Sequence, residues 1–178
     1  IDGVDTIVRM AVDYGATLGF PDSALITALL MVQFIAFPCA LLFSWYAKKI
    51  GVKQAIMTGI VGYGIITFLG YFMTSVLHFY ILAGMIGLFQ GGIQALSRSL
   101  YTRLIPAEKS AEFFGFYNML GKFAAVLGPF MMGTITVVTG NIRFGILSIL
   151  VLFIIGGFLL IKVNIKEGEK MAKEYLAK

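Results

Sequence analysis

The chain has 178 residues, of which 59% are hydrophobic and only 13% are charged, and its formal net charge is +5. Soluble domains usually carry about 25% charged residues, so this composition excludes an ordinary soluble globular protein. The positive charge does not indicate nucleic-acid binding, because the basic residues lie at the ends of apolar runs, without a basic stripe or aromatic platforms.

Long uncharged runs predict membrane-spanning helices. About 20 apolar residues, at about 1.5 Å rise each, cross a hydrocarbon core about 30 Å thick. In lipid each backbone group must pair within its own segment, and the alternating pattern of barrel strands is not seen in the sequence. The runs without Asp, Glu, Lys, Arg or His are residues 24–47, 54–77, 79–97, 123–142 and 144–161. In chain order we predict helices near residues 1–15, 23–48, 53–75, 78–103, 108–139 and 142–163.

The basic residues predict the orientation. Eleven of the fourteen Lys and Arg residues fall on one side of the predicted bundle, which the positive-inside rule makes cytoplasmic. These residues are Lys48, Lys49, Lys53, Arg98, Arg103, Lys109, Lys162, Lys166, Lys170, Lys173 and Lys178. Asp13, Asp22, His78, Asn141 and Arg143 fall on the other side. We expect residues 1–163 to form the bundle and residues 164–178 a cytoplasmic tail with a short helix.

Polar residues inside the spans are the candidate solute site, because such residues in lipid usually face a cavity or another helix. Gln90 and Gln94 share one helix face with Ser97 and Tyr101, and Asn118 shares a face with Lys122 one turn away. Helix arithmetic places polar groups of four helices at similar depth. The candidate substrate-binding residues are Asp5, Arg9, Gln33, Gln90, Gln94, Asn118 and Lys122.

Two interpretations of these residues stay open. Asp5 and Arg9, spaced i and i+4, are compatible with a structural ion pair, and the glutamines with interhelical hydrogen bonds. An ammonium at mid-membrane costs about 3 kcal/mol or more unless it is paired or hydrated, so Lys122 indicates a function. We expect Asp5 and Lys122 to be charge partners, and Asp5 to be the proton-coupling group.

Glycine and proline add two expectations about packing. Gly87 and Gly91 are spaced by four and predict a close approach of two helices. The pair Gly128 and Pro129 predicts a break in the fifth helix, of the kind common where transporters bind and move. Cys39 and His78 are the only residues of their types, so we expect no disulfide framework, no metal site and no cofactor.

Three segments carry a family resemblance: SRSLYTRLIP at residues 97–106, FGFYNMLGKFAAVLGP at 114–129, and the opening IDGVDTIVRMAVDYG. They resemble the last third of the sequences in the vacuole effluxer-like branch of the major facilitator superfamily. This branch includes fungal autophagy-related vacuolar amino-acid effluxers and bacterial proteins. The resemblance implies the carboxyl-terminal six-helix half of a twelve-helix transporter, an all-α fold with a three-plus-three inverted repeat. It also implies that the first helix is truncated and that the partner is the N-terminal half of the same transporter.

The segment between residues 44 and 53 resembles the superfamily's cytoplasmic signature. Lys49, Gly51 and Lys53 match its basic and glycine positions. Lys48 stands where an acid is usual, so we expect Glu108 or Glu112 to meet the basic residues instead. The candidate gating residues are Lys48, Lys49, Arg98, Arg103, Glu108 and Glu112.

These observations favour a secondary transporter that moves a small polar or zwitterionic solute by alternating access, with amino acids suggested by the resemblance. We expect it in the lipid bilayer of a bacterial plasma membrane, with a cytoplasmic C-terminus. A lipid or lysolipid flippase and a non-transporting membrane scaffold or receptor are the alternatives. An enzyme is not expected, because the sequence contains no HExxH or GxSxG motif.

Overall fold

The computed structural model describes the backbone of residues 2–176 and the side chains of residues 3–172. Ile1, residues 177–178 and the side chains of Asp2 and of residues 173–176 therefore lie outside the described part. The cytoplasmic position predicted for Lys173 and Lys178 therefore concerns side chains outside the described residues.

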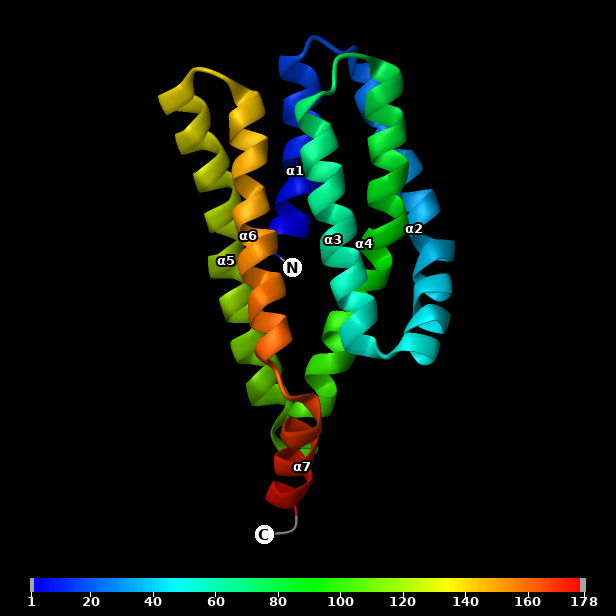
Figure 1. Cartoon of the computed structure of the whole chain (residues 1–178), viewed down its shortest axis with the longest axis vertical. Helices are drawn as coiled ribbons and strands as arrows, with labels where there is room; N and C mark the ends of the chain where they lie inside the picture. Colours follow the sequence, from blue (N-terminus) through cyan, green and yellow to red (C-terminus); the bar gives the residue numbers. More distant parts are fainter. Residues whose placement is uncertain (1, 177–178) are drawn as a thin grey trace.

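The described backbone is helical and contains no strand (Figure 1). Its elements are α1 (Asp2–Thr17), α2 (Asp22–Ile50), α3 (Val52–Tyr71), α4 (Val76–Leu104), the 3₁₀ helix η1 (Ala107–Lys109), α5 (Ser110–Thr139), α6 (Ile142–Lys162) and α7 (Ile165–Leu176). Helices α2 to α6 are long and apolar enough to cross a membrane, and α1 has 16 residues. The predicted all-α membrane fold is confirmed.

Local sequence explains where the helices end. The Ser75 hydroxyl accepts a hydrogen bond from the backbone N–H of His78 at 3.3 Å, which begins α4 at Val76. Helix α3 ends at Tyr71, four residues before the predicted boundary. Gly51 and Gly140 have φ values of 94° and 67°, which glycine adopts without strain, and each permits the sharp reversal into the next helix.

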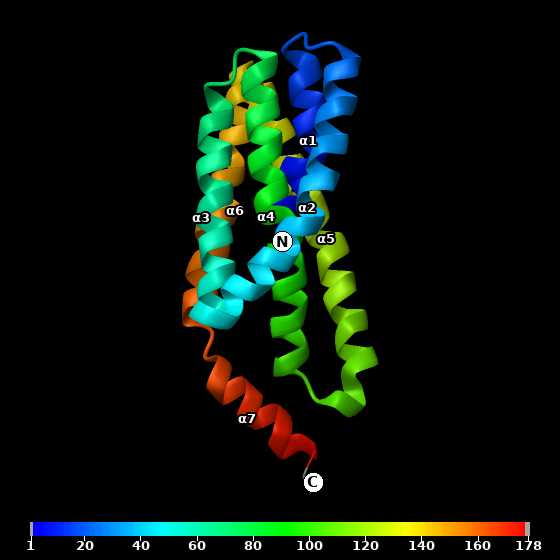
Figure 2. The same cartoon turned by 90° about the vertical axis from the view of Figure 1, so that its right-hand side faces the viewer.

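The break predicted at Gly128 and Pro129 is wrong. Helix α5 runs without interruption from Ser110 to Thr139. A proline removes one backbone hydrogen bond, but neighbouring helices hold such a segment in place within a membrane bundle. Pro38 also lies inside a continuous helix, and α2 bends along its length (Figure 2).

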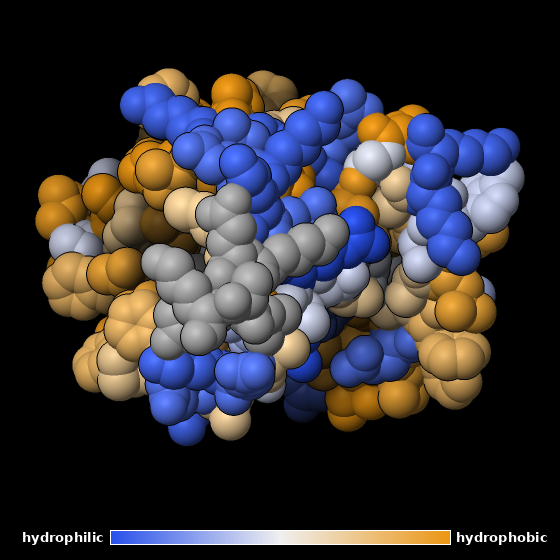
Figure 3. Space-filling view, turned by 90° about the horizontal axis from the view of Figure 1, so that it is seen from below, coloured by the Kyte–Doolittle hydropathy of each residue, from blue (hydrophilic) through white to orange (hydrophobic). Residues whose placement is uncertain are grey.

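The helices alternate in direction. The α1–α2, α3–α4 and α5–α6 connections lie at one end, and the α2–α3 and α4–α5 connections lie with α7 at the other (Figure 1). The second end carries most of the basic residues and is called the basic end below. Viewed from there, hydrophilic side chains gather on this surface and apolar side chains form much of the rim (Figure 3).

Small residues bring α2 and α4 together. A Cβ atom on Gly87 would lie 3.0 Å from the Val32 carbonyl oxygen, and one on Gly91 would lie 2.7 Å from that of Ala36. The predicted close approach is therefore confirmed. Helix α3 lies between α4 and α6, and α1 packs against α5 and α6.

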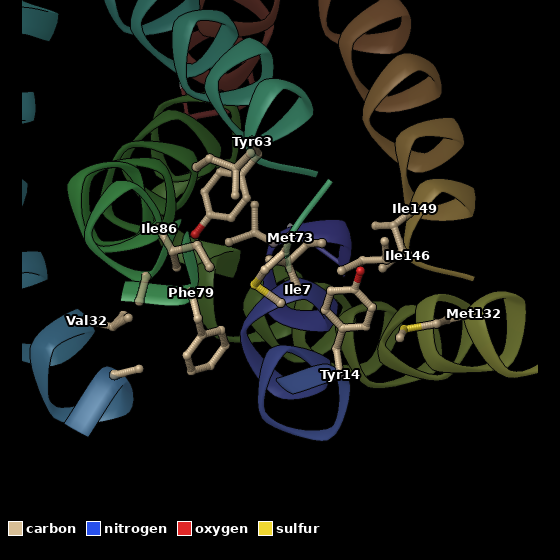
Figure 4. Close-up of a cluster of buried hydrophobic side chains, with 14 of the residues drawn as sticks. Ile7, Tyr14, Val32, Tyr63, Met73, Phe79, Ile86, Met132, Ile146 and Ile149 are labelled. Atoms are coloured by element: carbon tan, nitrogen blue, oxygen red, sulfur yellow. The ribbon is translucent and has the colours of Figure 1, made fainter. Parts of the chain in front are cut away.

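The core lies where these helices converge, and Figure 4 shows its largest cluster. Tyr14, Tyr63 and Met132 are at most 1% exposed. The Tyr14 hydroxyl donates to the Gly70 carbonyl oxygen at 2.8 Å, which joins α1 to α3. This packing holds α1 in register beside α3 and α4.

Candidate functional site

A hydrogen bond between α1 and α4 is the centre of the candidate site. The Gln94 side-chain amide donates to the Asp5 carboxylate at 2.9 Å, and both side chains are half-buried. The N-terminal end of α1 lies about halfway along the bundle, so this contact is at mid-membrane depth (Figure 1). Two of the predicted residues are thus brought together.

Four buried polar atoms of the described residues lack partners, and two of them are tyrosine hydroxyls near Asp5. The Tyr63 and Tyr117 hydroxyls, the Thr6 hydroxyl and the Gln90 side-chain oxygen are buried and form no hydrogen bond with any described residue. The Asp5 carboxylate lies within electrostatic range of both tyrosine hydroxyls. Buried polar groups are almost always satisfied in folded proteins, so these atoms indicate a place for water, a solute or another part of the protein.

Aromatic rings form one wall beside these atoms. The rings of Tyr101 and Tyr117 lie 4.7 Å apart between centroids, and the ring of Phe114 lies 5.5 Å from that of Tyr101. The Tyr101 hydroxyl donates to the Phe113 carbonyl oxygen at 2.9 Å. These contacts join α4 to the first half of α5 and fix the position of the Tyr117 hydroxyl.

The other predicted binding residues are exposed. These residues are Arg9, Gln33, Asn118 and Lys122. Neither Arg9 nor Lys122 forms an ion pair with Asp5 within the described residues, and the partner of Asp5 is Gln94 instead. Their role in binding stays a prediction.

Sequence reasoning missed Thr6, Tyr63 and Tyr117. Tyr63 lies in an uncharged, glycine-rich run in which its hydroxyl is a polar group among mostly apolar side chains, and the residue is 0% exposed. Tyr117 directly precedes Asn118 in the chain. A polar tip on an apolar ring was the available signal, but it does not separate a membrane-surface tyrosine from one in a site.

The basic end contains a second polar feature. A cleft of about 390 Å³ between α2, α3 and α4 brings Lys48 and Arg103 together with Ser44 and Ser99. Lys49 points elsewhere, and its ammonium lies 3.8 Å from the centroid of the Trp45 ring.

The expected meeting of these cations with Glu108 or Glu112 is not observed. All the candidate gating residues are exposed, and no ion pair joins either glutamate to Lys48, Lys49 or Arg103 in the part of the chain that the structure describes. The reason is geometric, because the basic ends of α2 and α5 lie on opposite sides of α4 (Figure 2).

The family model described as vacuole effluxer Atg22 like matches residues 1–173. The chain belongs to this family. It is 41% identical over 156 residues to the uncharacterized MFS-type transporter YxiO of Bacillus subtilis (strain 168), covering 88% of this chain and 36% of that protein. It is 34% identical over 134 residues to autophagy-related protein 22 of Yarrowia lipolytica, covering 72% of this chain and 22% of the relative.

A third relative is autophagy-related protein 22 of Saccharomyces cerevisiae (strain ATCC 204508 / S288c), 29% identical over 158 residues, or 85% of this chain and 29% of that protein. The chain thus spans about a third or less of the length of these relatives. No solved structure matches the chain significantly. Membership of this family makes it an integral membrane protein with a helical transporter fold.

Proposed function

We propose that this chain forms one half of the pathway of a secondary transporter that moves a small polar or zwitterionic solute by alternating access. The other half is the N-terminal six-helix bundle of the same protein. The observation that carries the proposal is the contact between Asp5 and Gln94 at mid-membrane depth, with the unpartnered Tyr63 and Tyr117 hydroxyls in electrostatic range of Asp5. In transporters built from repeats, solute sites lie at this depth between the two halves.

The chemistry of these atoms favours an amino acid. The Asp5 carboxylate and the Gln90 side-chain oxygen accept hydrogen bonds, as a solute ammonium group requires. The tyrosine hydroxyls donate, as a carboxylate requires, and Lys122 offers a cation on a face that the described bundle leaves uncovered. Asp5 is proposed as the proton-coupling group. The chain's membership of a vacuole effluxer family supports efflux of the solute.

The flippase and scaffold alternatives receive less support. A flippase needs a polar route for the headgroup, whereas the open groove between α3 and α6 is lined by apolar residues. A scaffold would use a close-packed, hydrogen-bonded polar seam. The buried polar atoms found here lack hydrogen-bond partners among the described residues, whereas the polar atoms of such a seam would be paired.

The proposal is tested with full-length protein in proteoliposomes, by measuring counterflow of a panel of amino acids. We expect saturable counterflow of at least one of them, and its loss in Asp5→Asn, which removes the charge that would hold the solute ammonium. Asp13→Asn is the matched control, because Asp13 is an exposed acid on the same helix. Unchanged affinity and rate in Asp5→Asn at equal protein content would contradict the proposed site.

A further inference from the structure

An apolar groove runs along the outside of the bundle between α3 and α6. Its volume is about 540 Å³, and its lining includes Met57, Ile60 and Gly64 of α3 with Leu150, Gly157 and Ile161 of α6. The groove is open along its side. It is separate from the site around Asp5, because the stacked rings of Tyr63 and Phe153 lie between the two helices, with centroids 5.7 Å apart.

Two glycines create the groove. A Cβ built on Gly64 would contact a Leu150 side-chain atom at 3.8 Å, and one built on Gly157 would contact side-chain atoms of Ile60 and Met57 at 3.7 Å. An alanine would fit at either position, whereas a leucine side chain would extend into the groove. The depth of the groove therefore depends on these two residues.

The length of the groove matches one leaflet of a bilayer. Its lining extends from Met57 to Phe68 on α3 and from Leu150 to Ile161 on α6. Each stretch covers about 16 Å of helix. That is about half of a hydrocarbon core about 30 Å thick, so the groove has the reach of one acyl chain.

Positive charge lies at the basic end of the groove. The Lys53 ammonium donates to the carbonyl oxygens of Ile161 and Val163 at 2.8 Å and 2.7 Å, which ties the start of α3 to the end of α6. The Lys162 ammonium lies 4.6 Å from the centroid of the Phe158 ring, which also lines the groove. No acidic side chain lines the groove within the described residues.

We propose that this groove is a binding site for one anionic phospholipid of the leaflet at the basic end. Its acyl chain fills the groove between α3 and α6, and its phosphate lies at Lys162. The apolar lining and the matching length select an acyl chain, and the cations at the basic end select a negative headgroup. Lys53 acts as a positioning residue that holds the groove at its width.

The test uses full-length protein in vesicles of equal parts phosphatidylglycerol and phosphatidylcholine, followed by gentle extraction and native mass spectrometry of the retained lipid. We expect wild-type protein to retain one phosphatidylglycerol that the Gly64→Leu/Gly157→Leu double variant loses. Gly156→Leu is the matched control, because Gly156 is the neighbouring glycine of α6 and a Cβ there meets open space.

A second variant tests the headgroup without touching the packing. Lys162→Gln should lower the preference for phosphatidylglycerol over phosphatidylcholine about fivefold, the effect of one lysine near an anionic lipid. Lys49→Gln should leave it unchanged, because Lys49 also lies over an aromatic ring at the basic end but away from the groove.

Three outcomes would overturn the proposal. The first is equal retention by wild type and a folded groove-filled variant. The second is equal loss in Lys162→Gln and Lys49→Gln, which would indicate general surface charge. The third comes from a photoreactive residue placed at Ile154, which lines the groove. Its cross-linking to the protein's own chain in place of lipid would show that a protein segment covers the groove.

Discussion

At the scale of single residues, the contact between Asp5 and Gln94 shows how a carboxylate is held within the membrane. A neutral amide donor at 2.9 Å stabilises the charge without cancelling it. A carboxylate has about four acceptor sites, so this one hydrogen bond leaves room for a cationic group of the proposed solute. A salt bridge with Arg9 or Lys122 would have neutralised that charge.

Lys122 should serve solute recognition rather than support of Asp5. Replacing it by Met keeps an apolar stem while removing the charge, so we expect normal folding and weaker solute affinity in Lys122→Met. Because no described contact joins Lys122 to Asp5, Lys122→Met combined with Asp5→Asn should not restore transport. Counterflow by full-length protein at matched membrane content measures both effects, and recovery in the double variant would show that the lysine only neutralises Asp5.

At the scale of the helices, close contacts between small residues, rather than helix propensity, set the distances between neighbouring helices. Helix α1 meets α5 where Gly128 faces Thr6, which is 1% exposed. A Cβ on Gly128 would lie 2.7 Å from the Cβ of Thr6, closer than two carbon atoms pack. This contact holds α5 against the helix that carries Asp5.

Gly128→Ala should destabilise the protein by about 1–3 kcal/mol relative to Gly133→Ala, the usual effect of overpacking. Gly133 lies in the same helix, and a Cβ there meets open space, so its replacement should be neutral or slightly stabilising. Thermal unfolding in detergent compares the two variants. Equal melting temperatures would show that α1 and α5 are not in close contact at Gly128.

At the scale of the whole molecule, the alternation of helix directions separates two polar ends. The basic end carries the cleft with Lys48 and Arg103, and the opposite end carries Asp22, His78 and Asn141. From the positive-inside rule we predict that the basic end is cytoplasmic.

Cysteine labelling tests this orientation in a Cys39→Ala background. A cysteine placed at Lys48 should react with an impermeant reagent only from the cytoplasmic side, and one placed at His78 only from the opposite side. Full-length protein in oriented membrane vesicles provides the measurement. Labelling of both positions from the same side would show that the topology is wrong.

The 178-residue chain on its own should not transport. Alternating access needs a second bundle that closes the opposite side of the solute pathway, and Arg9, Asn118 and Lys122 are exposed on faces that such a bundle would cover. Counterflow in proteoliposomes that contain only this chain should match empty vesicles. Saturable counterflow there would contradict the half-transporter proposal.

The sequence by itself determined the class of protein and its helices, and it predicts the side of the membrane on which each end of the bundle lies. These features are local or additive, because the length of an uncharged run and the side on which lysines lie depend on no distant residue. It also placed Asp5 and Gln94 among the candidate polar groups, because helix periodicity assigns each residue to a face.

Only the tertiary structure decided which faces meet. It selected Gln94 as the partner of Asp5, placed Tyr63 and Tyr117 within its electrostatic range, separated Glu108 from Lys48, and opened the groove between α3 and α6. The physical reason is that the rotation and spacing of each helix depend on contacts such as those at Gly91 and Gly128. Those contacts join residues far apart in the chain, and periodicity along one helix carries no information about its neighbour.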